Sequence, residues 1–188
     1  MTSCGARGEV IAARLNQQTL DHADTEPMLA LLAPESRQQL RGRDTDPWYL
    51  STRITPGFRL LPVPPRVTGS MAAAVDERGR LTVRTNYLIA YPFNPDLITQ
   101  VGEPLDAIVL GRARIEYTMI DDRRYTAAAQ GMWLGRSDGY LYSVACDWSA
   151  KGYLAPAYAN KNATKPGGPS RQEIFDPNAP LPEDATCL

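Results

Sequence analysis

Two long segments of the chain alternate between apolar and polar side chains, and this alternation constrains the fold more than any other feature. It runs over residues 81–91 and again over residues 108–120. A period of two is that of a β-strand with one buried face. The expected buried sets are Leu81, Val83, Thr85, Tyr87, Ile89 and Tyr91, and then Val109, Gly111, Ala113, Ile115, Tyr117 and Met119. Such strands are typical of an antiparallel sheet with one packed face and one polar face.

Two further strands complete the expected sheet. Residues 67–75 precede the first long strand, and the intervening sequence Asp-Glu-Arg-Gly at 76–79 is typical of a hairpin turn. A last strand is expected within 139–148. The sheet as a whole should therefore occupy residues 58–148.

The first part of the chain has helical patterns, which place helices within residues 6–43. The first runs over 9–20, with Ile11, Leu15 and Thr19 as its expected buried stripe. A second, over 24–33, can be capped by Asp24 or Thr25, and its expected stripe is Met28, Leu31 and Leu32. A third follows over 34–42.

Helices followed by long antiparallel strands predict an α+β fold with helices packed on a curved sheet. This order is similar to the cone-shaped architecture of nuclear transport factor 2-like (NTF2-like) domains, a likeness of fold alone. We expect a single domain over 1–158. Six of the 16 prolines follow Ala155, so residues 159–188 are expected to form an extended or disordered proline-rich tail.

Composition excludes several classes of function. The 20 basic and 21 acidic residues are well mixed, so we expect no nucleic-acid partner. No apolar run approaches the length of a transmembrane segment, and the start of the sequence lacks a signal-peptide pattern. With one histidine and three cysteines but no Cys-x-x-Cys pair, we expect neither a metal site nor a cofactor.

Three groups of reactive residues have simpler explanations than catalysis. Ser137 lies in a Gly-x-Ser-x-Gly sequence, but that motif requires a following helix and a later histidine, so a surface turn is expected. Asp121 and Asp122 are expected in a charged turn. His22 is expected to be solvated or to cap the end of a helix.

Aromatic residues provide the main candidate for a ligand site. Tyr87 and Tyr117 share the inner face of the long strands, and others come from the last strand region; the set is Tyr87, Tyr117, Trp133, Tyr142 and Trp148. Aromatic walls with a few polar groups are typical of a small-molecule pocket. The alternative, which we favour, is that these residues fill a core.

Two segments resemble a known group of proteins. "LTVRTNYLIAYPF" at 81–93 and "YSVACDWSAKGYLAPAY" at 142–158 resemble uncharacterised exported or membrane-anchored proteins of actinobacteria, over a region from 66 to 158. The resemblance implies an extracytoplasmic protein, secreted or anchored through a leader that this sequence lacks. A cytoplasmic protein with reduced cysteines is the alternative.

In an oxidising compartment a disulfide becomes an option. We expect Cys146 to pair with Cys187, because a proline-rich tail cannot otherwise be held against the domain; Cys4 is a competing partner. The bond would close a loop of about 40 residues and contribute about 4 kcal/mol by the chain-entropy estimate. Three free thiols would indicate the cytoplasm.

The expected function is a non-enzymatic, extracytoplasmic binding or scaffolding module, with an unknown protein partner or a small apolar ligand, and with a homodimer left open. The alternative is a small-molecule-binding protein or an isomerase- or cyclase-type enzyme that uses the cone. Such an enzyme needs a carboxylate beside Tyr87 and Tyr117. The only candidates for the acid or base of such an enzyme are Asp21, His22 and Asp147. Because none of them is expected on the long strands beside the tyrosines, we favour the module.

Overall fold

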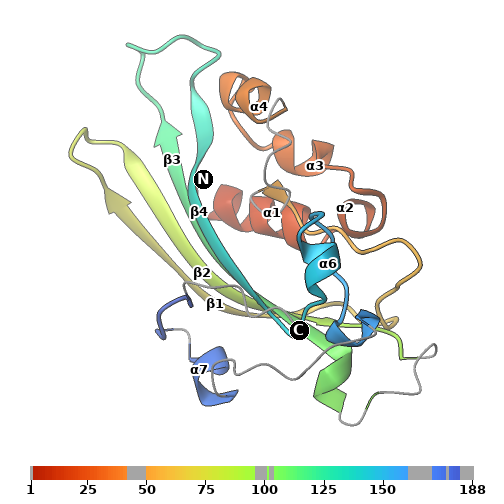
Figure 1. Ribbon diagram of the computed structural model, residues 1–188. Coiled ribbons are helices and arrows are strands. Elements are labelled where there is room, and N and C mark those ends of the chain that lie inside the picture. Colours follow the sequence, from red (N-terminus) through yellow and green to blue (C-terminus); the bar gives the residue numbers. More distant parts are fainter. Residues whose placement is uncertain are drawn as a thin grey trace.

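The computed structural model describes residues 2–41, 50–95, 101, 104–160, 171–176 and 178–182, and it confirms the α+β class (Figure 1). The helices are α1 (Thr2–Arg14), α2 (Gln17–His22), α3 (Glu26–Leu29), α4 (Pro34–Arg41), α6 (Cys146–Ser149) and α7 (Arg171–Phe175). The strands are β1 (Arg66–Val75), β2 (Leu81–Pro92), β3 (Ile108–Ile120) and β4 (Gly131–Tyr142). Short 3-10 helices, η1 (Pro104–Ala107) and η2 (Ala157–Ala159), lie before β3 and after α6.

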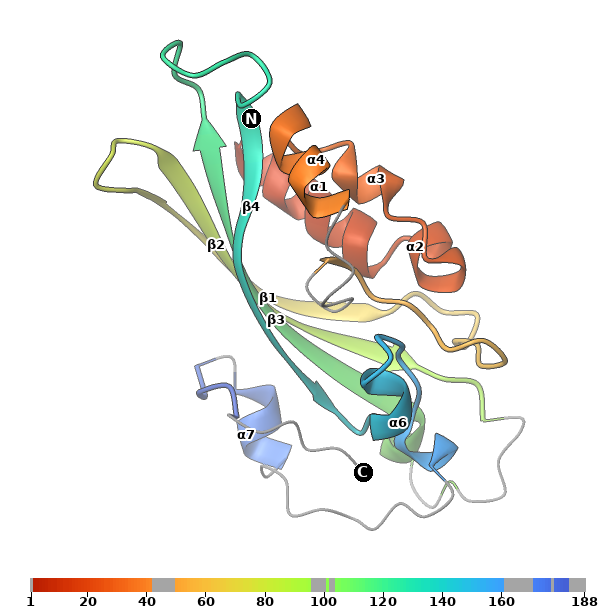
Figure 2. The same ribbon diagram turned by 45° about the horizontal axis from the view of Figure 1, so that its top comes forward.

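The four strands form one antiparallel sheet in the order β1-β2-β3-β4. The turn from β1 to β2 is held by Asp76, whose side chain accepts hydrogen bonds from the backbone of Arg78 and Arg80. The sheet curves, with α1 to α4 on its concave side and α7 on the opposite side (Figure 2). We call these sides the inner face and the outer face.

The inner face is packed as the alternation predicts. In register across β2 and β3, Val83 lies beside Tyr117 and Thr85 beside Ile115, and all four are buried. The helices add apolar residues to this layer: Ala6, Val10, Ala13, Met28, Leu29, Leu32 and Leu40. A second cluster, nearer the other end of the sheet, joins Ile89, Tyr91, Phe93 and Val109 to Leu20, Ile54, Val144 and Leu154.

The helix expected over 9–20 is wrong in two respects. It is two helices, because Asn16 adopts an extended conformation and its side chain caps α2 by accepting from the backbone of Gln18 and Thr19. Its buried stripe also differs, since Ile11 is 44% exposed and the buried face carries Glu9 and Arg14. The helix expected over 24–33 is shorter, since α3 covers only Glu26–Leu29. Leu29 is buried, whereas Leu31, expected in the buried stripe, lies in the following turn and is exposed.

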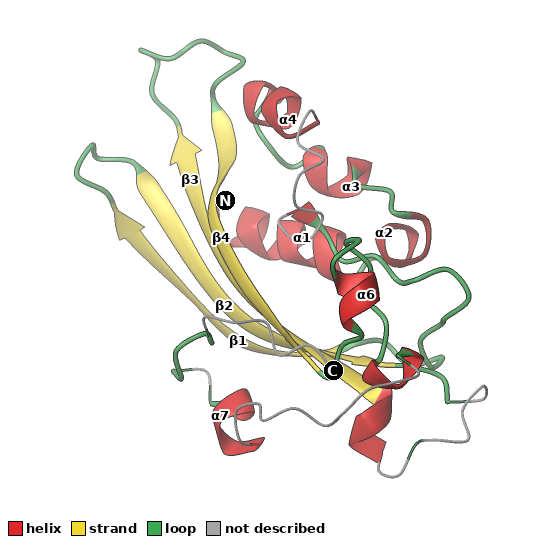
Figure 3. Cartoon of the chain, in the orientation of Figure 1, coloured by secondary structure: helices red, strands yellow, loops and turns green. Residues whose placement is uncertain are grey.

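The last strand also lies elsewhere than expected. It is β4, Gly131–Tyr142, and it ends where Ser143 adopts a left-handed conformation with φ 57°. The turn expected at 135–139 is therefore wrong, since those residues lie inside β4 beside a bulge between Ile115 and Tyr117. Cys146, expected in a strand, begins α6, and Trp148 lies in the same helix (Figure 3).

The described part of the tail crosses the outer face. It comprises α7 with Asp176, and residues 178–182, which together we call the outer segment. Its Ile174 and Leu181 pack on an outer cluster of the sheet: Leu110, Tyr140 and Tyr142, with Leu88, Ala90 and Ile108. The helical turn of α7 is regular structure, which the prediction for 159–188 does not include. For the residues of that range that the structure does not describe, the extended or disordered tail stays a prediction.

Candidate binding surface on the outer face of the sheet

A carboxyl group lies in the packed interior beside Tyr117, one of the two inner tyrosines. Glu9, on α1, is 1% exposed, and its carboxylate accepts a hydrogen bond from the hydroxyl of Tyr117 on β3. Burial raises the pKa of Glu9 to about 7, although the Tyr117 hydrogen bond and the charge of Arg14 oppose the rise. Burial also raises the pKa of Tyr117, and the Glu9 charge adds to that rise.

Arg14 extends this polar group along the inner face. Its Nη1 donates to the Thr52 hydroxyl at 3.4 Å, and that hydroxyl lies 3.1 Å from the hydroxyl of Tyr91. The Tyr91 hydroxyl also donates a hydrogen bond to the backbone oxygen of Arg14, at 3.2 Å. Burial raises the pKa of Tyr91 to about 12. The arrangement joins α1, β2 and the chain at Thr52 through groups that are all buried.

The five aromatic residues predicted to line a pocket do not meet at one place. Tyr87 and Tyr117 share the inner face, where Tyr87 packs against both inner clusters. Tyr142 lies in the outer cluster, and Trp133 is in register with Thr118, on the side opposite Tyr117. Trp148 stacks edge-on with Tyr153, with the Lys151 ammonium 4.9 Å from its ring.

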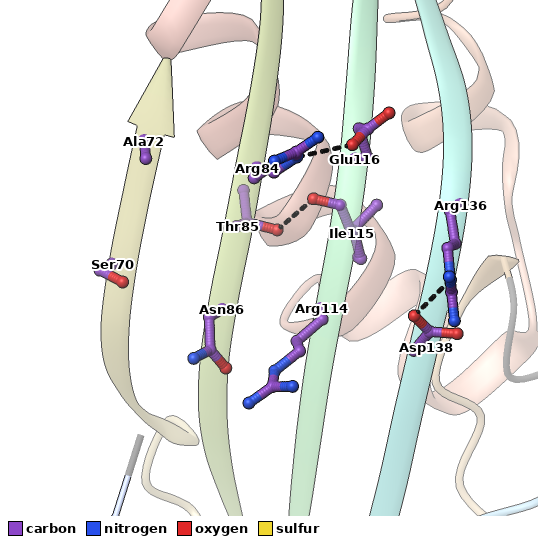
Figure 4. Close-up of a pocket in the computed structure, with 10 residues that line it drawn as sticks. All are labelled: Ser70, Ala72, Arg84, Thr85, Asn86, Arg114, Ile115, Glu116, Arg136 and Asp138. Atoms are coloured by element: carbon purple, nitrogen blue, oxygen red, sulfur yellow. Dashed lines mark hydrogen bonds and ion pairs between the residues drawn. The ribbon is translucent and has the colours of Figure 1, made fainter. Parts of the chain in front are cut away.

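A groove of about 550 Å³ lies on the outer face over all four strands (Figure 4). Its lining includes Ser70, Arg84, Asn86, Arg114, Glu116, Arg136 and Asp138. Ion pairs of 2.7 Å join Arg84 to Glu116 and Arg136 to Asp138. The two arginines are exposed and the two carboxylates half-buried, so each pair contributes little to stability.

The outer segment covers the sheet beside this groove. Arg114, which also lines the groove, donates from Nη2 to the backbone oxygen of Ala179 at 2.9 Å. Arg112 is 2% exposed, and its Nε donates to the side-chain oxygen of Asn86 at 3.4 Å. Burial lowers the pKa of Arg112, whereas Tyr142 and Asp176 stabilise its charge. We call Arg112, Arg114, Tyr140 and Tyr142 the Arg–Tyr surface.

The strand β1 forms an open edge of the sheet. It pairs with β2 on one side, and nine of its ten residues are exposed while Met71 is half-buried. No charged side chain occurs from Val67 to Val75, and these two valines are 38% and 68% exposed. Natural edge strands usually carry charges or prolines that prevent pairing with another strand, so this edge is open to one.

The remaining reactive residues occupy unremarkable places. His22 ends α2 and is exposed, and Asp122 accepts hydrogen bonds from Arg124 in the loop after β3. Ser137 lies within β4 opposite Ile115, which is not the strand-to-helix turn of a nucleophilic serine. Among the described residues, no group of three or more His, Cys, Asp and Glu side chains could hold a metal ion. No helix in the described ranges is long and apolar enough to cross a membrane.

Comparison with protein-family models gave no match, and comparison with curated proteins and with solved structures gave no significant similarity. The class of this protein therefore rests on its own geometry: among the described residues, an α+β domain with a packed inner face, a grooved and partly covered outer face and the edge strand β1. Sequence reasoning missed Glu9, since a charged residue on a helix is normally assigned to the solvent side. It also missed the Arg–Tyr surface, although Arg112 and Arg114 stood on the predicted polar face.

Proposed function

We propose that this protein is a non-enzymatic binding and scaffolding module that assembles through its sheet, and that the open edge β1 joins two copies. The observation that carries the proposal is the exposed strand β1 with its uncharged sequence. Strand addition to an open edge supplies affinity through main-chain hydrogen bonds. A second copy is the occupant that fits the side chains best.

The fit follows from the symmetry of an antiparallel pair. If two β1 strands pair about a two-fold axis at Met71, Val67 of each copy lies opposite Val75 of the other. The two large exposed apolar side chains of the strand then cover each other, and no like charges are opposed. Such a contact is isologous, and it would extend the sheet across both copies.

Charge substitutions at the two valines test this register. In the V67K/V75K variant, lysines would face lysines at both ends of the pair, so association should weaken about tenfold or more. The V67K/V75E variant places each lysine opposite a glutamate, and it should restore association. Sedimentation equilibrium measures both, with V67T/V75T as the neutral control. A monomer in the unmodified protein, or equal association of all variants, would refute the pairing.

The proposal also covers the fold family of the protein, its location and a disulfide. A curved sheet with helices on its concave side supports assignment to the NTF2-like architecture. The resemblance to actinobacterial exported proteins supports an extracytoplasmic location, secreted or membrane-anchored, and with it a disulfide between Cys146 and Cys187. Cys187 lies outside the described residues, so that pairing stays a prediction.

The second candidate function is a small-ligand protein or an isomerase-type enzyme. Glu9 favours it, because a carboxyl group beside Tyr87 and Tyr117 is what such an enzyme requires. Its burial speaks against it, as does the position of the groove on the other face. A thermal-shift screen of planar apolar compounds tests it: stabilisation of the unmodified protein that is lost in Glu9→Gln would favour this candidate over the module.

A further inference from the structure

The outer segment is held on the sheet like a bound peptide. Two aliphatic side chains, Ile174 and Leu181, enter the outer cluster, and Arg114 binds the backbone oxygen of Ala179 between them. Phe175, the largest apolar side chain of α7, is instead half exposed. The described contacts of the segment with the sheet thus lie at Ile174, Ala179 and Leu181, and α7 lies on the outer side of the sheet (Figure 2).

The surface beneath the segment has the composition of an interaction site. Tyrosine and arginine are the residues that most often dominate the energetics of protein interfaces. The rings of Tyr140 and Tyr142 lie 4.4 Å apart, and Arg112 is close enough to Tyr142 to share a hydrogen bond with it. Arg112 is buried in this surface and Arg114 is half-buried; a buried cation is costly unless it is paired, so a sheet that needed only a cover would not require one there.

Charge complementarity identifies what this surface accepts. The carboxylate of Asp176 stabilises the charge of Arg112, and Glu173 lies near enough to Tyr142 to raise the pKa of its hydroxyl, after burial and Tyr140. Both acids are exposed, and both lie within two residues of Ile174, whose side chain packs on the outer cluster. The segment thus presents carboxylates and branched aliphatic groups to arginines and tyrosines.

We propose that the Arg–Tyr surface is the docking site for an acidic segment of a partner protein, and that the outer segment occupies it as an internal competitor. The partner's segment carries a carboxylate for Arg112. It also carries branched aliphatic side chains that pack on the outer cluster where Ile174 and Leu181 pack now. This inference deepens the proposed binding function and rests on it, but it concerns a different surface from β1.

Two features make the outer segment replaceable. The helix α7 has five residues, and a helix of that length has no stability of its own in water. Its release leaves the inner clusters untouched, because neither contains a residue of the outer segment. The groove next to the segment shares Arg114, so a longer ligand can continue past Ala179 towards Arg84 and Arg136.

A labelled peptide with the sequence of residues 171–182 provides the probe. We would titrate it into the full-length protein and into the full-length variant I174D/L181D, whose outer segment cannot keep its aliphatic anchors. Fluorescence anisotropy should show binding to I174D/L181D about tenfold tighter or more than to the unmodified protein, because the competitor is gone. The matched control, F175D, changes an exposed residue of the same helix and should bind as the unmodified protein does.

Further variants test the chemistry. Adding Arg114→Ala to I174D/L181D should weaken binding about tenfold, and so should replacing Asp176 by Asn in the peptide. Circular dichroism establishes that the variants are folded. Independently of any variant, excess unlabelled peptide should shift the amide signals of residues 171–182 of an isotope-labelled unmodified protein to the positions of a released segment.

Three results would overturn the proposal: equal affinity of the peptide for the unmodified protein and I174D/L181D, no binding to I174D/L181D at about 1 mM peptide, or unshifted amide signals. If the peptide does not behave as expected, the sedimentation result for β1 pairing still stands. If the β1 strands do not pair, the measured peptide affinities still stand. The two proposals are therefore tested separately.

Discussion

The hydroxyl of Tyr117 donates a hydrogen bond to the carboxylate of Glu9, and this bond joins β3 to α1 inside the packed inner face. The two residues stand 108 positions apart in the sequence. An unpaired buried carboxyl group would be costly, so the bond offsets part of the cost of placing Glu9 in the interior. The remaining cost appears as a raised pKa, and it makes the fold sensitive to pH.

Glu9→Gln should remove a pH dependence of stability. The pKa of Glu9 is about 7 in the folded protein and about 4.3 in an unfolded chain. Between these values the folded state holds a proton that the unfolded state has lost, so rising pH favours unfolding. The unmodified protein should lose about 3 kcal/mol relative to the variant between about pH 4 and pH 8.

Urea titrations of both proteins across this range measure the effect. The side-chain oxygen of glutamine can still accept from Tyr117, so the variant should be at least as stable as the unmodified protein above neutral pH. Parallel pH profiles of the two proteins would show that Glu9 does not titrate in this range.

Tyr117→Phe should destabilise the protein by about 1–3 kcal/mol, since it leaves the buried Glu9 without this donor. It should also raise the pKa of Glu9 further, because the lost hydrogen bond opposes the effect of burial. In the Glu9→Gln background the same change should cost less, which a double-mutant cycle measures. Tyr125→Phe, in the exposed loop after β3, serves as the control and should change nothing.

Gly69→Ala should disturb β1 far more than Gly79→Ala. Both glycines have positive φ, 155° and 75°. A Cβ atom at Gly69 would stand 2.2 Å from the backbone oxygen of Asn86 on β2, whereas at Gly79 no atom lies within 4 Å. We expect a cost of about 3 kcal/mol or more at Gly69 and about 1 kcal/mol at Gly79. Chemical denaturation compares the two, and similar costs would mean that β1 does not approach β2 so closely.

A disulfide between Cys146 and Cys187 should be present in protein purified without reductant. Mass spectrometry of a non-reduced tryptic digest should contain a linked pair of peptides with these two residues. A link from Cys4 to either residue would instead attach α1, and three alkylatable thiols would indicate a reducing compartment.

The strands β2 and β3 could be predicted because each keeps one alternation over its whole length, with apolar side chains on the inner side. β4 could not, because the bulge opposite Glu116 reverses the alternation midway: Leu134 lies in register with Tyr117, and Ser137 with Ile115. Gly135 and Gly139 also weaken the strand pattern in the sequence, because glycine is uncommon inside strands. The structure explains their presence: a Cβ atom at Gly135 would stand 3.0 Å from the backbone oxygen of Glu116, and one at Gly139 would stand 3.3 Å from that of Arg112.

The candidate site was less predictable than the sheet. Periodicity assigns Glu9 and Arg14 to the solvent side of α1, and only their tertiary partners Tyr117, Thr52 and Tyr91 explain their burial. The outer segment has too few apolar residues to show a pattern, so its docking depends on a surface supplied by β3 and β4. Contacts between distant parts of the chain leave no local signal in either case.

The position of the outer segment has a consequence for the order of events during synthesis. The helices α1 to α4 leave the ribosome before the strands that they cover, so the inner face can close once Val144 and Leu154, the last residues of its second cluster, have emerged. Residues 171–182 follow later, and until then the tyrosines and arginines of β3 and β4 stand uncovered. Under the proposed docking, a partner's segment would thus have its first access to this surface just before the chain's own segment arrives.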